Sequence, residues 1–393
     1  DRVISPEKIT NFLPVQKKGK DAELVTQYEM HTVEQLGLLK MDFLGLRNLS
    51  IIDRTVELIN KDEFNIDQIP LSDEKTFELF SSGRMIGVFQ LESRIAQITA
   101  RSLKPKRFED IVALVALIRP GPLGANMHIE FADRATGKKE IEFLHEDLKV
   151  ILEETYGVIL YQEQVMQIAQ RISGFQLDEA DDLRKAMGKK IPKVMEQQRK
   201  KFTDGAIKKG YSEQFSVELF DQIAFFAGYG FNKSHSVPYA LIAYQTAYLK
   251  ANFPAEYLSA CLTAVKRDKE RTAVFLAEAR ELGVNVNTPD INLSIEDFSV
   301  ANGEILFGLS AIRNVGDITA EKIVLERENG AYETVQDFLA RTDSRSLNKR
   351  GVEAMIQGGA FDKFGFPRRG LYDSIIDLIE DAKGLKKSKN NSQ

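Results

Sequence analysis

The residue types best suited to chemistry gather between Gly228 and Ser236, in the sequence GYGFNKSHS. The side chains there that could bind a ligand are Lys233, Ser234 and His235. We expect a helix over 238–252 directly after them, with a serine as N-cap and Pro238 in the first turn, where a missing N–H costs nothing. Backbone N–H groups left free at this junction, together with the lysine, suit an anionic oxygen ligand. A well-capped core helix would give the same pattern, so both interpretations stay open.

A second cationic segment, from Asp181 to Lys201, reads DDLRKAMGKKIPKVMEQQRKK. From Arg184 onward this segment contains one acid, Glu196. Its basic residues are Arg184, Lys185, Lys189, Lys190, Lys193, Arg199, Lys200 and Lys201. Because the whole chain has a net charge of −5, this positive charge is local. We expect Gly188 and Pro192 to interrupt the helix and to leave backbone N–H groups beside the cations. That arrangement suits a triphosphate or a phosphodiester backbone, whereas a solvated helix face is the plainer alternative.

A lone acid, Asp42, lies inside the apolar run 36–49, LGLLKMDFLGLRNL. We expect the apolar residues around it to form a buried strand, namely Leu38, Leu39, Met41 and Phe43. A buried carboxylate is costly unless it meets a cation or a metal, and Lys40 lies two residues away on the same strand face. Spacing does not separate two interpretations of this pair. One is a structural Lys–Asp pair, and the other is a carboxylate that binds Mg²⁺ beside a lysine.

The composition is that of a globular protein with a sizeable core: 393 residues, 43% hydrophobic and 28% charged. Such a length predicts two or three domains. The single cysteine, Cys261, excludes an internal disulfide or a thiolate cluster and fits a reducing compartment. The histidines are scattered without HExxH or CxxC spacing, and no Walker A or GxGxxG motif is present. The longest apolar run, 111–118, is too short to span a membrane.

Hydrophobic periodicity predicts a largely helical chain. We expect helices over 50–60, 73–81, 91–101, 108–118, 141–154, 159–173, 179–187, 193–209, 212–226, 238–252, 255–265 and 270–282. A β-hairpin follows, with strands 298–300 and 304–307 around Asn302-Gly303, a strong short hairpin signal. Short helices separated by glycines make up the remainder. These patterns place domain boundaries near residue 60 and residue 300.

The C-terminal region contains a candidate helix-hairpin-helix at 311–324, AIRNVGDITAEKIV. We expect a tight turn through Asn314 and Gly316, followed by a helix capped by Asp317 or Thr319. The N–H groups of such a turn point at a DNA phosphate and bind it without reading sequence. A weaker second copy would occupy 347–371, with these basic residues nearby: Lys349, Arg350, Lys363, Arg368 and Arg369. Any short helical hairpin can look like this, but two in tandem with basic residues favour DNA binding.

Seven motifs, in order along the chain, resemble those of bacterial family C DNA polymerases. They are LLKMDFLGLRNLSII (38–52), GVFQLES (87–93), LVALIRPGPL (114–123), TYGVILYQEQVMQIAQ (155–170), DDLRKAMGKK (181–190), FAGYGFNKSHSVPYALIAYQTAYLKA (226–251) and TPDIN (288–292). The resemblance extends over nearly the whole chain. The form KMDFLGLRN resembles the shorter branch of the family, which lacks an inserted proofreading exonuclease.

The resemblance implies a fold that is mainly α with a small α+β part. Residues 1–60 would be the end of a palm of the polymerase-beta-like nucleotidyltransferase type, 61–300 a large helical fingers domain, and 301–393 a tandem helix-hairpin-helix module. The paired palm aspartates of the family would lie before residue 1, so we expect a fragment that is inactive alone. Asn314 departs from the glycine usual in such hairpins, although asparagine tolerates a left-handed turn.

The resemblance also implies site residues and partners. Asp42 matches the third of three palm aspartates that hold two Mg²⁺ ions, and Lys40 matches the adjacent active-site lysine. The residues expected to bind the incoming deoxynucleoside triphosphate are Arg184, Lys185, Lys189, Lys190, Lys233, Ser234 and His235. The residues expected to bind DNA are Asn314, Gly316, Lys349, Arg350, Arg368 and Arg369. Primed template DNA would be the other substrate. A sliding clamp and other replisome subunits would bind mostly outside this chain, in the cytoplasm and without a membrane.

The implied activity is template-directed DNA synthesis by a DNA-directed DNA polymerase. The primer 3′-OH would attack the α-phosphate in line, with two Mg²⁺ ions activating the nucleophile and stabilising the leaving group. Asp42 would act as a metal ligand, not as a general base. Two rival functions remain open on residues alone. One is a non-catalytic DNA-binding protein that uses the hairpins and the basic helix, and the other is a helical scaffold with negligible salt-dependent DNA binding.

Overall fold

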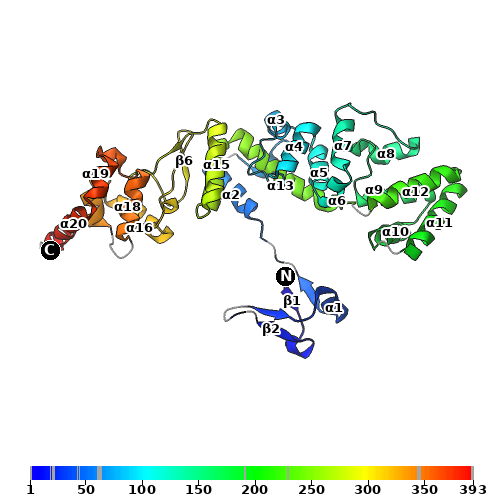
Figure 1. Cartoon of the computed structure of the whole chain (residues 1–393), viewed down its shortest axis with the longest axis horizontal. Coiled ribbons are helices and arrows are strands. Elements are labelled where there is room, and N and C mark those ends of the chain that lie inside the picture. The colour runs from blue at the N-terminus through cyan, green and yellow to red at the C-terminus, as the bar shows by residue number, and fades with distance from the viewer. Residues whose placement is uncertain are drawn as a thin grey trace. The chain divides into compact units, whose positions relative to one another are not determined.

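The computed structural model describes residues 2–17, 19, 23–41, 43, 45–59, 64–189, 192–227, 230–342 and 347–390. Two compact units divide the chain, Asp1–Arg47 and Asn48–Gln393. The described residues are mainly helical, with three small sheets, as the sequence predicts (Figure 1). None of the helices in these ranges combines the length and the apolar character needed to cross a lipid bilayer.

The N-terminal unit contains two small antiparallel sheets and one short helix. Its elements are β1 Arg2–Ile4, a 3₁₀ turn Ile9–Asn11, β2 Val15–Lys17, β3 Leu24–Thr26, α1 Met30–Gln35 and β4 Leu39–Met41. β1 pairs with β4 so that Val3 lies opposite Lys40, and β2 pairs with β3. A small core of Leu13, Val33 and Leu38 holds the unit together.

The strand predicted around residue 40 is confirmed, but its predicted burial is wrong for every apolar residue except Leu38. Leu39, Met41 and Phe43 are 58%, 40% and 67% exposed. Side chains alternate across a strand, so Leu39 and Met41 share the face opposite to Leu38. Within the described part of this unit, the small core covers only the Leu38 side of the two-stranded sheet.

In the second unit, a large apolar core surrounds α13, Lys233–Asn252, which packs against α3, α5 and α14. The first helices after the N-terminal unit are α2 Arg47–Ile59, α3 Glu74–Ser82, α4 Arg94–Leu103, α5 Phe108–Leu117, α6 Pro120–Gly124 and α7 Met127–Ala135. The sequence patterns predict neither α6 nor α7. For α6 the reason is that the prolines and glycine after Arg119 indicate a turn. Proline is however favoured in the first turn of a helix, and Pro120 begins α6.

A separate core joins five further helices. The elements of this group are α8 Lys149–Leu152, α9 Gln162–Ser173, α10 Leu177–Lys189, α11 Pro192–Lys208 and α12 Glu213–Ala227. The helix predicted over 141–154 is reduced to α8, with a 3₁₀ turn on each side. The interruption predicted at Gly188 is also wrong. α10 continues to Lys189, since one glycine costs a helix only about 1 kcal/mol, and Pro192 begins α11.

The C-terminal part begins with α14 Pro254–Val265 and α15 Lys269–Glu281. A three-stranded sheet follows in the order β5-β7-β6, made of β5 Val286–Asn287, β6 Ser299–Ala301 and β7 Glu304–Leu306. The predicted hairpin is confirmed, and Asn302 and Gly303 have φ of 54° and 78°, as its tight turn requires. The last helices are α16 Asp317–Glu326, α17 Val335–Arg341, α18 Lys349–Gly358, α19 Arg368–Asp373 and α20 Ile375–Asn390.

A buried ion pair fastens the segment 84–92 to α13 and α15. Lys250 on α13 is only 1% exposed, and its Nζ donates to the carboxylate of Glu278 on α15 at 2.7 Å. The same Nζ donates to the carbonyl oxygens of Arg84 and Ile86, again at 2.7 Å. Burial lowers the pKa of Lys250, and the nearby Glu278 carboxylate acts against this lowering. All three acceptors therefore depend on one ammonium group.

Candidate nucleotide and nucleic-acid interface

Two extended segments pair and place two helix starts next to each other. Tyr161 and Phe231 form a parallel bridge. The N–H of Gln162 donates to the Phe231 carbonyl at 2.9 Å, and the N–H of Phe231 donates to the Leu160 carbonyl at 3.1 Å. α9 starts at Gln162 and α13 starts at Lys233, directly after the bridge. The bridge therefore positions the polar cluster that the sequence places after Gly228.

The start of α13 is capped by groups of the protein itself. The N–H of Lys233 donates to both carboxylate oxygens of Glu163 at 3.0 Å. The N–H of His235 donates to Oδ1 of Asn232, the N-cap residue, at 2.9 Å. The prediction of free N–H groups at this junction is therefore wrong for these two. The predicted start at 238 is wrong as well, because the Asn232 cap begins the helix earlier and leaves Pro238 inside it.

The side chains of Lys233, Ser234 and His235 differ in how readily they could bind a ligand. Nζ of Lys233 lies 2.6 Å from a carboxylate oxygen of Glu154. Ser234 and His235 are exposed, and the His235 ring centroid lies 4.4 Å from that of Tyr239. The lysine has to leave an acid to bind a phosphate, whereas the serine hydroxyl and the histidine ring are open to solvent.

The basic helix α10 lies beside this cluster. The carboxylate of Asp181 binds both Arg184 and Lys185 at 2.7 Å. Arg184 also donates to Oε1 of Gln162 at 3.4 Å, and the Gln162 amide donates to the carbonyl of Gly230 at 3.1 Å. Gln162 thus links α10 to the segment that leads into α13. Two of the segments predicted to bind a nucleotide are side by side.

Two cations of α10, Arg184 and Lys185, are paired with an acid of their own helix. The Lys185 ammonium and the Arg184 guanidinium hold the pKa of Asp181 below its usual value, and Asp181 in turn raises the pKa of Lys185. A phosphate must therefore compete with Asp181 for both cations. Of the other predicted residues on this helix, Lys189 ends α10 with its side chain outside the described part, and Lys190 lies outside the described residues.

Sequence reasoning missed a cation that the fold brings to this place. The exposed guanidinium of Arg119 stacks on the Phe231 ring, 4.0 Å from its centroid, as a cation–π contact. It also missed the acids that pair with the cluster, Glu154 and Glu163. A signal for Arg119 was present, since an arginine before Pro120 stands in the motif LVALIRPGPL. Glu163 likewise stands in the motif TYGVILYQEQVMQIAQ, but no local pattern shows what either acid pairs with, because their partners lie far along the chain.

The palm candidates belong to the N-terminal unit. Asp42 lies outside the described residues. Lys40 is half-buried on β4, opposite Val3. Among the residues that the structure describes, no three His, Cys, Asp or Glu side chains come together in a way that could hold a metal ion. The described residues therefore do not form a metal site by themselves.

The first hairpin turn has the predicted path but a different cap. Asn314 adopts a left-handed φ of 64°, which asparagine tolerates, and the turn ends at Gly316. The predicted caps, Asp317 and Thr319, are wrong, because Gly316 is the N-cap of α16. Asp317 is the first helical residue, and its carboxylate binds Nζ of Lys266 at 2.6 Å. This contact lowers the pKa of Asp317 and ties the hairpin to the end of α14.

The start of α18 packs against the first hairpin turn. A Cβ added at Gly351 would lie 3.1 Å from the carbonyl oxygen of Asn314, so only glycine fits this approach without displacement. Lys349 lies 3.7 Å from Glu353 on its own helix. Arg350 is exposed and has no ion pair among the described residues. The structure thus brings two of the predicted DNA-binding segments together.

The two remaining predicted arginines have different surroundings. Arg368 donates to Asp362 at 2.8 Å and to the carbonyl of Gln357 at 2.9 Å, so it closes the loop between α18 and α19. Its Asp362 partner raises the pKa of Arg368. Arg369 pairs with Asp373 at 2.8 Å and stays largely exposed. Arg368 therefore contributes more than Arg369 to the contacts that hold its own hairpin.

Three family models match successive parts of this chain. Residues 2–45 match the bacterial DNA polymerase III alpha NTPase domain, 48–210 match the bacterial DNA polymerase III alpha subunit finger domain, and 283–371 match a helix-hairpin-helix motif. The segment around α9 and α10 lies within the finger match, and both hairpins lie within the third match.

Curated relatives are similar to nearly the whole chain. The DNA polymerase III subunit alpha of Thermus aquaticus is 46% identical over 387 residues, which is 96% of this chain and 31% of that relative. Those of Escherichia coli (strain K12) and Mycobacterium leprae (strain TN) are 45% and 42% identical over 394 residues, 97% and 98% of this chain and 34% of each relative. The chain spans about a third of the length of the curated relatives it matches. These matches, together with the three family models, show that the chain belongs to the family of bacterial DNA polymerase III alpha subunits.

Proposed function

We propose that this chain supplies the fingers and the helix-hairpin-helix region of a bacterial DNA-directed DNA polymerase, which transfers dNMP to a primer 3′-OH. The observation that carries the proposal is the bridge between Tyr161 and Phe231, because it brings the segment of Arg184 to that of Lys233. A triphosphate is held mainly by position and by positive charge. This junction gathers cations from α10 and α13, together with Arg119, the residue before α6. The family membership supports the same interpretation.

The proposed binding step is an exchange of anionic partners. Arg184 and Lys185 would leave Asp181, and Lys233 would leave Glu154, to bind phosphate oxygens of the incoming nucleotide. The cations stay paired before and after the exchange. Asp181 and Glu154 lose these partners, but both carboxylates are partly exposed, so water can solvate them. Until the nucleotide arrives, the acids hold each cation in place, which reduces the entropy lost on binding.

We propose Asp42 as the metal ligand that this chain contributes, with Lys40 beside it. When bound, a divalent metal ion, proposed to be Mg²⁺, stabilises charge on the reacting phosphate. The described residues provide no further set of ligands. The proposed partners are primed template DNA and deoxynucleoside triphosphates. A sliding clamp and other replisome subunits would bind through regions mostly outside this chain, and the proposed location is the cytoplasm.

Replacing Arg184 with alanine is expected to raise the KM for dNTP by about 10- to 100-fold, with a smaller change in kcat. A hydrogen bond to a charged group contributes about 1.5–3 kcal/mol, which corresponds to this range. The measurement is steady-state primer extension by the polymerase that carries this chain. The matched control is Arg199→Ala on α11, whose guanidinium pairs with Asp221 outside the junction. An unchanged KM for Arg184→Ala removes this residue from the triphosphate site.

Replacing Arg350 with glutamine is expected to weaken duplex binding and to lower the salt dependence of the affinity by about 0.9 in slope, as for one lost phosphate contact. Fluorescence anisotropy of the 393-residue chain with labelled duplex DNA, from low to high salt, measures both quantities. Arg94→Gln on α4 is the control, since Arg94 is exposed and outside the hairpins. If both variants keep the native slope, Arg350 is not a DNA contact. If the native chain shows no salt dependence, the hairpins do not bind DNA.

A further inference from the structure

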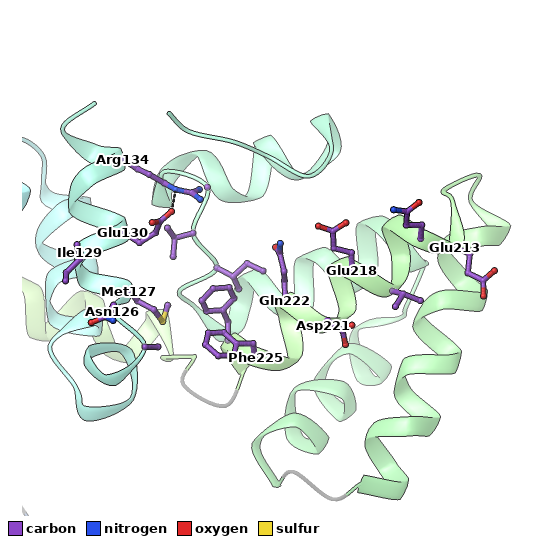
Figure 2. A pocket seen from close by; sticks show the side chains of 17 residues that line it. Asn126, Met127, Ile129, Glu130, Arg134, Glu213, Glu218, Asp221, Gln222 and Phe225 are labelled. Atoms are coloured by element: carbon purple, nitrogen blue, oxygen red, sulfur yellow. Dashed lines mark hydrogen bonds and ion pairs between the residues drawn. The ribbon is translucent and has the colours of Figure 1, made fainter. Parts of the chain in front are cut away.

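A groove between α7 and α12 is unrelated to the residues proposed for polymerisation. It has a volume of about 1170 Å³, with one wall from α7 and the two residues before it and one wall from α12 (Figure 2). The segment 157–159 also lines it. None of the side chains assigned above to a nucleotide or to DNA lines it. We define the α7–α12 groove by its lining residues on these two helices, and it lies within the second compact unit.

The α12 wall presents one complete stripe of that helix. Residues 213, 217, 221 and 225 line the groove, as do 214, 218, 222 and 226, and both sets have a spacing of four. Positions four apart share a helix face, so the stripe extends over about 20 Å from the first to the last residue. A second helix of similar length, about fourteen residues, would fit such a groove by the helix-in-groove mode of recognition.

The chemistry of the groove changes along its length. At one end, Phe225 and Ile129 are 55% and 50% exposed, although both are large apolar side chains, and Met127 lines the groove beside them. Figure 2 shows Phe225 opposite Met127 and Ile129, and Glu218 and Glu213 successively farther along α12. One end therefore loses exposed apolar surface when covered, which is favourable.

The other end carries unpaired negative charge. Glu213 and Glu218 are exposed and have no ion-pair partner among the residues that the structure describes. By contrast, Asp221 pairs with Arg199, and Glu130 pairs with Arg134 at 2.8 Å. Two free carboxylates beside an apolar patch repel a phosphodiester backbone and attract lysine or arginine. Charge complementarity therefore selects a basic occupant and disfavours nucleic acid.

We propose that the α7–α12 groove binds an amphipathic α-helix of a protein partner, with apolar residues at one end of its buried face and lysine or arginine at the other. The apolar end would cover Phe225 and Ile129, and the basic end would pair with Glu213 and Glu218. This interaction is independent of the proposed polymerase activity, since it uses none of the same residues.

The test uses two labelled peptide probes of about fourteen residues, designed as helices with the same leucine face. One probe carries lysines at its polar end and the other carries glutamates there. Fluorescence anisotropy with the 393-residue chain is expected to show saturable binding of the lysine probe only. Equal binding of both probes, or no binding of either, overturns the proposal.

Two groove variants and their matched controls locate the binding. The double substitution Glu213→Gln with Glu218→Gln is expected to weaken the affinity for the lysine probe about three- to tenfold, because each exposed charge pair contributes little binding free energy. Glu270→Gln with Glu281→Gln, exposed acids on α15, is expected to leave it unchanged. Phe225→Ser is expected to weaken it at least about tenfold. Phe366→Ser, with the same exposed fraction of 55%, is the control.

Two further measurements establish whether the variants stay folded and what covers the groove. Thermal unfolding shows whether Phe225→Ser remains folded. If Phe225→Ser unfolds, the variant Glu213→Gln with Glu218→Gln still tests the groove, because it changes no core residue. Light scattering of the chain without probe gives its oligomeric state. If the native chain is a dimer that Phe225→Ser converts to a monomer, the groove is covered by a second copy and the proposed partner is wrong. If the groove variants and the controls lower the affinity for the lysine probe equally, the probe binds elsewhere and the proposal is also wrong.

Discussion

Replacing Asp42 with asparagine is expected to reduce primer extension by at least about a thousandfold while leaving DNA affinity nearly unchanged. The substitution keeps the size of the side chain and removes the negative charge that a metal ligand contributes, and a metal ion can supply several kcal/mol of transition-state stabilisation. Asp42 lies outside the described residues, so this prediction rests on the motif LLKMDFLGLRNLSII and on the family of the chain. The measurement is extension of a labelled primer by the polymerase that carries this chain, at matched DNA occupancy.

The control for Asp42→Asn is Asp53→Asn, because Asp53 is exposed on α2 and forms no ion pair in the described part of the chain. The control is expected to keep native extension. Retained extension in the Asp42 variant would mean that the catalytic carboxylates lie elsewhere. Loss of DNA affinity together with extension would point to a structural Lys–Asp pair. No extension by the native protein would favour the DNA-binding rival.

Replacing Lys250 with methionine is expected to lower the free energy of unfolding by about 3–5 kcal/mol, because removing one partner of a buried ion pair leaves the other charge uncompensated. Methionine approximates the volume of the lysine stem, so the main loss is electrostatic. Glu278 is 6% exposed and would be left without its ammonium partner. The carbonyls of Arg84 and Ile86 would lose the same donor. Urea denaturation of the 393-residue chain, monitored by far-UV circular dichroism, measures the change.

The matched control for Lys250→Met is Lys138→Met. Its ammonium lies 3.6 Å from Asp133, and its side chain is 66% exposed. An exposed pair contributes about 0–1 kcal/mol, so this control is expected to unfold close to the native protein. Equal effects of the two substitutions would show that Glu278 is not held by Lys250 in solution. A local effect confined to the segment 84–92 would appear as faster hydrogen exchange there without a change in global unfolding.

Much of the secondary structure was predictable because it depends on patterns in contiguous residues. The helices over 108–118, 193–209 and 212–226 follow the 3.6-residue period, and the structure has them as α5, α11 and α12 with small shifts at the ends. Asn302-Gly303 predicts its hairpin because few residue pairs adopt two successive positive φ angles. The missed α6 and the early start of α13 share one cause. A proline in the sequence indicates a nearby helix boundary, but the exact position of that boundary depends on which residue caps the helix.

The candidate site was predictable only in part. Residue types and motif order indicate that Arg184, Lys233 and His235 serve one ligand, but they say nothing of how far apart these side chains lie. The bridge between Tyr161 and Phe231 decides that distance. Arg119 joins the same place through stacking on Phe231. The motif LVALIRPGPL contains this arginine, but nothing in the motif shows that it lies beside Phe231.

The sequence by itself determined the helical class, the hairpin and the family, because each depends on the local order of residues. Only the tertiary structure decided which charges are paired and which are free. Lys233 and Glu154 are 79 positions apart, and Lys250 and Glu278 are 28 apart, so no local pattern predicts either pair. The same holds for Glu213 and Glu218, which look like ordinary helix acids in the sequence. They become a candidate binding surface because folding places them beside exposed apolar residues and leaves them without a partner in the described structure.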